Sequence, residues 1–259
     1  MITLTLPSTA SPNDYPNNTV STFRTKLQEP VSLPRHGEYE VGIAEIQFPT
    51  LIANVRDCWI KVDRGKEFGE RFYGEKQPLE DGFYSNSDQL MTAIHNRFAT
   101  LNLLSELKVK INEFSRIVTF HVMVPMVLQI SRNLAYILGF DNTIIEHNSH
   151  QRTDYKGQQA FDLFRGLEHI YVYSDLVTNV ALGHTQAPLL RVVNTNMSSD
   201  PTHRCISFTR INWLPLSVRH FDRVLIYLRL TSGEPVPFMS GSCIVTLHIR
   251  RRTRSSLSF

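Results

Sequence analysis

The densest group of possible metal ligands in the sequence consists of Glu146, His147 and His150. Carboxylate and imidazole groups are common metal ligands, but a site needs three or four of them and a shell of hydrogen bonds that orients them. A His-x-x-His pair in a polar stretch meets little of that requirement. We therefore interpret these residues as part of a solvent-exposed loop, with a metal site as the alternative.

A possible nucleophile occurs in residues 241–243 (GSC). The alternation of the residues that follow places Cys243 on the same strand face as Val245 and Leu247, which predicts a small core residue instead. The sequence contains no phosphate-binding P-loop, no Gly-x-Ser-x-Gly nucleophile elbow and no His-Glu-x-x-His zinc helix. These motifs therefore give no support to a catalytic role.

Three further histidines, His121, His169 and His248, lie in dissimilar strand-like segments. A cupin-like metalloenzyme would bring its histidine ligands together on adjacent strands, so each of these is more simply an outward-facing polar residue. No catalytic constellation emerges from the residue types and spacings. We predict that the chain is not an enzyme and that it holds no cofactor and no metal.

Aromatic residues recur at strand period, at Tyr171, Tyr173, Trp213 and Tyr227. Such side chains can stack on sugars or bases in a binding groove. At this spacing they more often belong to a core or to a subunit interface. The pattern favours burial and contact over reaction.

The formal net charge of +3 is unevenly distributed along the chain. Residues 235–259 hold four arginines and no acidic residue, so residues 1–234 carry a net charge of −1. The arginines are Arg250, Arg251, Arg252 and Arg254. This basic tail either contacts nucleic acid or an acidic partner, or it is a solvated strand end, and the sequence does not separate these interpretations.

The composition is that of an ordinary globular protein, with 259 residues, 42% hydrophobic and 20% charged, which is enough for a large core. No apolar run reaches the roughly 18 residues of a membrane span. The N-terminus lacks a basic segment followed by an apolar core, so we expect neither a transmembrane helix nor a signal peptide. Cys58, Cys205 and Cys243 are far apart, which predicts buried, reduced thiols in a protein made inside a cell.

A β-rich framework must position all of these residues, because strand-like runs follow one another through the last third of the chain. The runs are residues 169–177, 188–194, 205–216, 223–230 and 241–250. Short alternating strands separated by turn residues, with no helical period among them, predict an antiparallel sandwich or barrel. Residues 38–48 have apolar side chains on both faces, which is typical of a strand covered on both sides.

The periodicity changes between residues 83 and 140. Four apolar residues form one face of a predicted amphipathic helix: Leu90, Ile94, Phe98 and Leu101. Ser85 and Asp88 have the spacing of a capping box ahead of it. Residues 108–111 and 117–124 predict a hairpin, and residues 131–138 predict a short helix that Gly139 ends.

These patterns divide the chain into two parts. We predict a mainly β protein in which residues 1–82 and 141–259 form the sandwich and residues 83–140 form a helix–hairpin–helix α+β insertion. Residues 141–166 are polar and are predicted to form a long surface loop.

Several segments, taken together in this order, resemble the minor capsid, or penton, protein of Polinton/Maverick elements and of the related adintoviruses and virophages. The resemblance spans nearly the whole chain and rests on the order and spacing of the segments. They are residues 15–19 (YPNNT), 40–46 (EVGIAEI), 82–84 (GFY), 134–140 (LAYILGF), 171–175 (YVYSD), 189–193 (LLRVV) and 247–250 (LHIR).

This resemblance implies a single jelly-roll β-sandwich that forms homopentamers at the vertices of an icosahedral shell, beside a double-jelly-roll major capsid protein. It implies a location in the virion capsid and assembly inside the host cell, where packaged DNA is a candidate partner for the basic tail. The outward tyrosines and residues 63–80 and 141–166 are candidates for the contact that closes the ring. The alternative function is a carbohydrate-binding jelly-roll protein for host attachment.

Overall fold

The computed structural model describes residues 1–64, 74–195 and 203–252. The chain divides into two compact units, of which unit 1 comprises Met1–Ile52 and Gly166–Phe259 and unit 2 comprises Ala53–Arg165. Each unit has its own hydrophobic core, and no residue is shared between the two cores. Unit 2 is therefore an insertion between two strands of unit 1.

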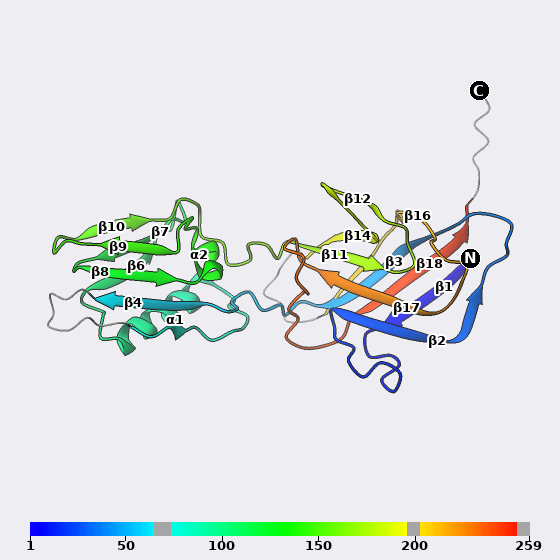
Figure 1. Cartoon of the computed structure of the whole chain (residues 1–259), viewed down its shortest axis with the longest axis horizontal. Helices are drawn as coiled ribbons and strands as arrows, with labels where there is room; N and C mark the ends of the chain where they lie inside the picture. The colour runs from blue at the N-terminus through cyan, green and yellow to red at the C-terminus, as the bar shows by residue number, and fades with distance from the viewer. Residues whose placement is uncertain (65–73, 196–202, 253–259) are drawn as a thin grey trace, which may run out of the picture. The chain divides into compact units, whose positions relative to one another are not determined.

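Unit 1 is a sandwich of two antiparallel sheets (Figure 1). The first sheet has the strand order β1-β18-β3-β15, with the short β16 also paired to β3, and the second has the order β14-β11-β17-β2. The eight principal strands are β1 (Ile2–Pro7), β2 (Thr22–Ser32), β3 (Tyr39–Pro49), β11 (His169–Ser174), β14 (Leu189–Asn194), β15 (His203–Ser207), β17 (His220–Arg229) and β18 (Ile244–Arg251). The smaller strands are β12 (Val180–Leu182), β13 (Thr185–Ala187) and β16 (Leu214–Pro215).

The order of these strands confirms the predicted jelly roll. Successive principal strands move between the sheets so that the first, eighth, third and sixth lie side by side in one sheet and the fifth, fourth, seventh and second in the other. Two Greek keys folded into a double sheet of eight strands give this arrangement. The inward residues predicted from the alternation along β17 are confirmed, since Val224, Ile226 and Leu228 are all fully buried.

Strand β3 corrects one expectation about residues 38–48. Its register with β18 shifts between Ile43 and Glu45, which leaves Ala44 as the extra residue of a β-bulge. The bulge turns the apolar residues on both sides of it, such as Ile43 and Ile46, into the same core. The apolar residues that seemed to alternate thus belong to one face, while on the opposite face only the first half of the strand is covered, at Glu40 and Gly42.

Unit 2 contains two small antiparallel sheets and two helices (Figure 1). One sheet is β5-β4-β8-β9 and the other is β10-β7-β6. The strands are β4 (Trp59–Arg64), β5 (Gln77–Pro78), β6 (Leu107–Ile111), β7 (Val118–Val122), β8 (Met126–Ile130), β9 (Ile144–His147) and β10 (Thr153–Lys156). The predicted hairpin is confirmed by the pairing of β6 with β7.

The helices of unit 2 are α1 (Ser87–Thr100) and α2 (Arg132–Leu138). Helix α1 buries Leu90, Ile94 and Phe98, as its apolar period predicts. Its cap lies one residue later than expected, because the Asn86 side chain accepts from the Gln89 backbone N–H. Helix α2 ends at Gly139, whose left-handed φ of 80° is the conformation that glycine adopts most easily.

The insertion is longer at both ends than the predicted residues 83–140, and residues 53–82 and 141–165 belong to unit 2. The reason is strand pairing: β4 pairs with β8, and β10 pairs with β7. Residues 141–166 are therefore not a long loop, because they contain β9 and β10. Neither helix in the described ranges combines the length and apolar character that crossing a membrane requires.

Candidate assembly interface

The outward face of the sheet β14-β11-β17-β2 carries the tyrosines that the sequence singles out. Tyr173 and Tyr227 are register partners on β11 and β17, and their rings stack with centroids 4.9 Å apart and planes 9° apart. Partial burial raises the pKa of both phenols, so that they stay neutral hydrogen-bonding groups at neutral pH. Half-buried tyrosines on an outward sheet face are typical of a protein contact surface.

Two arginines lie on the same sheet face, each over a tyrosine ring. The Arg229 guanidinium lies 5.5 Å from the Tyr227 ring centroid, and the Arg24 guanidinium lies 5.6 Å from that of Tyr15. Two buried atoms, Nη1 of Arg229 and Nε of Arg24, have no hydrogen-bond partner within the described part of the chain. Both arginine side chains are nevertheless partly exposed, so their positive charge favours a partner that carries oxygen acceptors.

One carboxyl group lies in the same surface. The Asp175 carboxylate accepts a hydrogen bond from the Leu225 backbone N–H at 3.0 Å, and burial raises the pKa of this group despite the nearby positive charge of Arg24. The face thus combines stacked tyrosines, arginines and one partly buried acid. We name the outward residues Arg24, Tyr171, Tyr173, Tyr227 and Arg229 the tyrosine–arginine face.

The outward face of the other sheet, β1-β18-β3-β15, has a different chemistry. Its central carboxylate, Glu45, accepts hydrogen bonds from Gln47 Nε2 and Ser207 Oγ, each at 2.9 Å. These hydrogen bonds lower the pKa of Glu45 and hold it ionised. We name the outward residues Thr3, Thr5, Glu45, Gln47, Thr246 and Ser207 the threonine–glutamate face.

Cys205 lies on β15, and its thiol is exposed. The expectation that all three cysteines are buried is therefore wrong for this residue, because the outward position of an edge strand leaves its side chain open. Cys58 and Cys243 are buried, and burial raises the pKa of Cys58 to about 11 and that of Cys243 to about 12. The buried pair agrees with the prediction.

The predicted basic tail is largely neutralised where it is described. Arg250 Nε lies 2.6 Å from Glu40 Oε1, and Arg252 Nη1 lies 3.1 Å from Glu38 Oε2. Arg251 is exposed at the end of β18, and Arg254 lies outside the described residues. The contact of these arginines with nucleic acid stays a prediction, with two of their charges already facing carboxylates.

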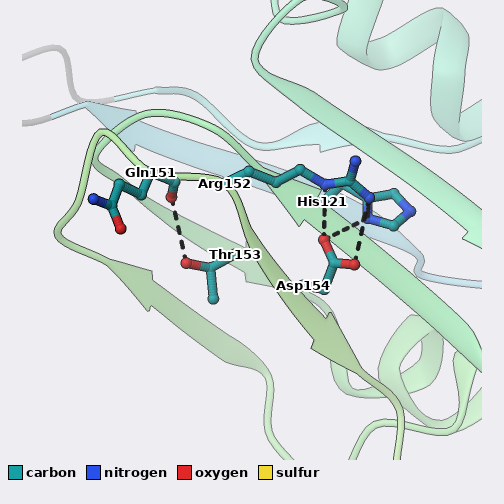
Figure 2. Close-up of polar contacts among 5 residues, drawn as sticks. All are labelled: His121, Gln151, Arg152, Thr153 and Asp154. Carbon is teal, nitrogen blue, oxygen red and sulfur yellow. Dashed lines mark hydrogen bonds and ion pairs between the residues drawn. The ribbon is translucent and has the colours of Figure 1, made fainter.

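The strongest polar cluster of unit 2 joins β7 to the edge strand β10 (Figure 2). His121 Nδ1 lies 2.7 Å from Asp154 Oδ1, and Arg152 Nε lies 3.1 Å from the same oxygen. The His121 hydrogen bond, with that of Arg152, lowers the pKa of Asp154. Because His121 and Asp154 are register partners, we interpret the cluster as a cross-strand hydrogen bond, joined by the Arg152–Asp154 ion pair, that holds the edge strand in place.

The possible metal ligands do not converge. His147 is buried, contrary to the exposed loop that we expected, because it lies on β9 and its Nδ1 contacts the Tyr155 hydroxyl at 3.2 Å. In the three described ranges, no group of three or more His, Cys, Asp or Glu side chains is arranged to hold a metal ion. Glu146 and His150 therefore do not form a group of metal ligands with His147.

Sequence reasoning identified the tyrosines and places Arg229 on the same face as Tyr227, but it missed Arg24 and Glu45. The available signal was alternation, since Arg229 and Tyr227 share one parity on β17 and both face away from the buried residues. Glu45 could not be placed, because the bulge at Ala44 changes the parity of its strand.

Comparison with known proteins gives one structural neighbour to report. No protein-family model matches the chain, and no curated protein matches it either. Among solved structures, the selenomethionine-labelled penton protein of mavirus is similar, with 11% sequence identity, a TM-score of 0.49, and coverage of 97% of this chain and 99% of that chain. An identity and a TM-score this low do not assign a family.

Proposed function

We propose that this chain is a structural viral capsid protein, a penton that forms pentameric capsomers at the vertices of an icosahedral shell. The observation that supports it best is a jelly roll whose two outward sheet faces are unlike, one rich in tyrosine and arginine and the other in threonine and glutamate. The motifs shared with penton proteins, in the same order along the chain, add support.

Unlike faces favour a head-to-tail ring. If two copies met through the same face, Arg24 and Arg229 of one copy would approach those of the other, and like charges would repel. A heterologous contact instead brings the tyrosine–arginine face of one copy to the threonine–glutamate face of the next. There the ionised Glu45 would face the positive charges of Arg24 and Arg229. Such contacts generate a closed ring when the rotation between copies completes a circle.

In this proposal the pentamer lies beside a double-jelly-roll major capsid protein, in a virion capsid assembled inside the host cell. Packaged DNA is the proposed partner of the basic end of β18. Because Arg250 and Arg252 already contact carboxylates, replacing the four tail arginines by Ser should weaken salt-sensitive DNA retention only slightly. Retention that does not change at all would remove DNA from the proposal.

Native mass spectrometry of the purified full chain tests the ring. Five copies of the 29.8 kDa chain give a species of about 149 kDa. Combining Tyr227→Ala with Arg229→Ala should weaken each subunit contact by about 2 kcal/mol, roughly 30-fold, since buried tyrosine and arginine dominate interface energies.

Tyr136→Ala is the matched control, because Tyr136 is an exposed tyrosine of unit 2 that also has an arginine, Arg165, over its ring at 5.3 Å. This variant should keep the mass of the parent. A wild-type protein that is trimeric, or that loses its assembly equally in both variants, contradicts the proposal.

A further inference from the structure

A pocket of about 330 Å³ opens in unit 1 where the start of β3, the short β16 and the end of β18 meet. This volume is at the lower end of the range of small-molecule sites. The polar and aromatic residues that line it are Glu38, Tyr39, Glu40, Trp213, Arg219 and Arg252. Two of them belong to features that the sequence singles out, an aromatic residue and an arginine of the basic tail.

The Trp213 ring is held rigidly at this pocket. The Arg250 guanidinium lies 3.9 Å from the ring centroid, and Arg250 Nε contacts Glu40 Oε1 at 2.6 Å. Glu40 is itself buried. Its carboxylate therefore holds the Arg250 side chain in place, and Arg250 in turn restricts the Trp213 ring. Arg250 covers one face of Trp213 and does not line the pocket, which leaves the remaining surface of the ring for a ligand. A fixed aromatic platform binds a ring-shaped ligand at little cost in side-chain entropy.

The charged groups of the lining balance each other, with two carboxylates and two guanidinium groups. Glu38 Oε2 contacts Arg252 Nη1 at 3.1 Å, and Arg219 donates to the carbonyl oxygen of Arg35. A carboxylate accepts about four hydrogen bonds and a guanidinium donates five, so these contacts leave both kinds of group with spare capacity. The pocket therefore offers acceptors and donors side by side without a net charge.

We propose that this pocket binds a neutral saccharide. The apolar C–H face of a sugar ring stacks on Trp213, and its hydroxyl groups, which both donate and accept, bond Glu38, Arg219 and Arg252. An anionic ligand would meet the two carboxylates, and a cationic ligand would meet the two arginines. This binding activity is independent of the ring proposed above, since every residue of the pocket comes from one copy of unit 1.

The chain has two tryptophans, so Trp59→Phe leaves Trp213 as the only indole and its fluorescence as a direct reporter. The full-length variant is titrated with the methyl glycosides of glucose, galactose, mannose and N-acetylglucosamine. Sialyllactose and a proline-rich peptide serve as an anionic and a peptide comparison. At least one neutral glycoside should change the Trp213 emission saturably, with a millimolar dissociation constant.

Calorimetry then compares variants with the glycoside that binds. Trp213→Ala should abolish binding, and Glu38→Gln should weaken it about tenfold, the loss of one charge-assisted hydrogen bond. Glu38 is 57% exposed, so its variant keeps the fold and decides the question even if Trp213→Ala unfolds. The inference is overturned if no neutral glycoside binds at tens of millimolar, if only sialyllactose or the peptide binds, or if Glu38→Gln binds as tightly as its parent.

Discussion

Unit 1 and unit 2 bury their apolar residues in different ways, and the difference shows in their surfaces. In unit 1 two sheets face each other, so half of every principal strand points outward and two broad sheet faces stay open. In unit 2 two smaller sheets share one core with two helices, and its exposed apolar side chains, such as Phe114 and Ile144, lie on separate turns and strand ends. The broad sheet faces that are open to contact are therefore those of the sandwich, whereas the insertion is a compact unit with its own core.

Separate cores predict separate unfolding, which core substitutions can test. Phe120→Ala removes a fully buried ring that packs 5.3 Å from that of Phe140, and it should destabilise unit 2 by about 3–5 kcal/mol. Leu247→Ala should destabilise unit 1 by about 2–5 kcal/mol. Hydrogen exchange followed by mass spectrometry should find the loss of protection confined to the mutated unit. A loss that spreads equally through both units would mean that the chain folds as a single cooperative body.

The three cysteines sharpen the same comparison, because Cys58 belongs to the core of unit 2, Cys243 to that of unit 1, and Cys205 is exposed. Burial raises the pKa of Cys58 to about 11, so its thiolate is roughly a hundredfold rarer at pH 8 than that of an ordinary thiol. In the native protein only Cys205 should react with iodoacetamide.

In Phe120→Ala, Cys58 should become reactive before Cys243, and in Leu247→Ala the order should reverse. Peptide mapping of the alkylated protein gives this order. Simultaneous labelling of both buried thiols in either variant would contradict two independent cores.

The smallest expected effect is a change in the stability of unit 2 with pH, through the contacts of its edge strand β10. The hydrogen bond from His121 lowers the pKa of Asp154, so this contact stabilises the fold above the usual pKa of an aspartate, about 3.9, and is lost as pH falls through the lower folded value. Asp154→Asn should therefore reduce stability slightly at pH 7 and match the parent near pH 2. Urea denaturation of both proteins at the two pH values checks this. A stability difference that persists at the acidic pH would show that the ion pair is not its cause.

The sequence predicts those parts of the fold that depend on local periodicity. Strands β17 and β18 alternate cleanly, so the inward set Val224, Ile226 and Leu228 follows from the residues alone. The bulge at Ala44 and the pairing of β4 with β8 depend on contacts between distant segments, which is why one strand face and both boundaries of the insertion were misplaced.

The carboxylate partners of the basic tail could not be predicted, for the same reason. The partners of Arg250 and Arg252, Glu40 and Glu38, lie more than two hundred residues earlier in the chain and come beside them only through the pairing of β18 with β3. The outward tyrosines and Arg229 were predictable from alternation, whereas the place of Arg24 beside them needed the pairing of β2 with β17.

The most direct test of a head-to-tail ring mixes two variants of the protein, in which substitutions disrupt different faces. One copy carries Tyr227→Ala and Arg229→Ala on the tyrosine–arginine face, and the other carries Glu45→Arg on the threonine–glutamate face, so that the two altered faces do not complement each other in charge. Each alone should be a 29.8 kDa monomer by native mass spectrometry. Mixed in equal amounts, they should form a heterodimer of about 60 kDa and nothing larger, because one intact contact remains between them. If either variant assembles alone, or if the mixture stays monomeric while the wild type forms rings, the two faces do not meet as proposed.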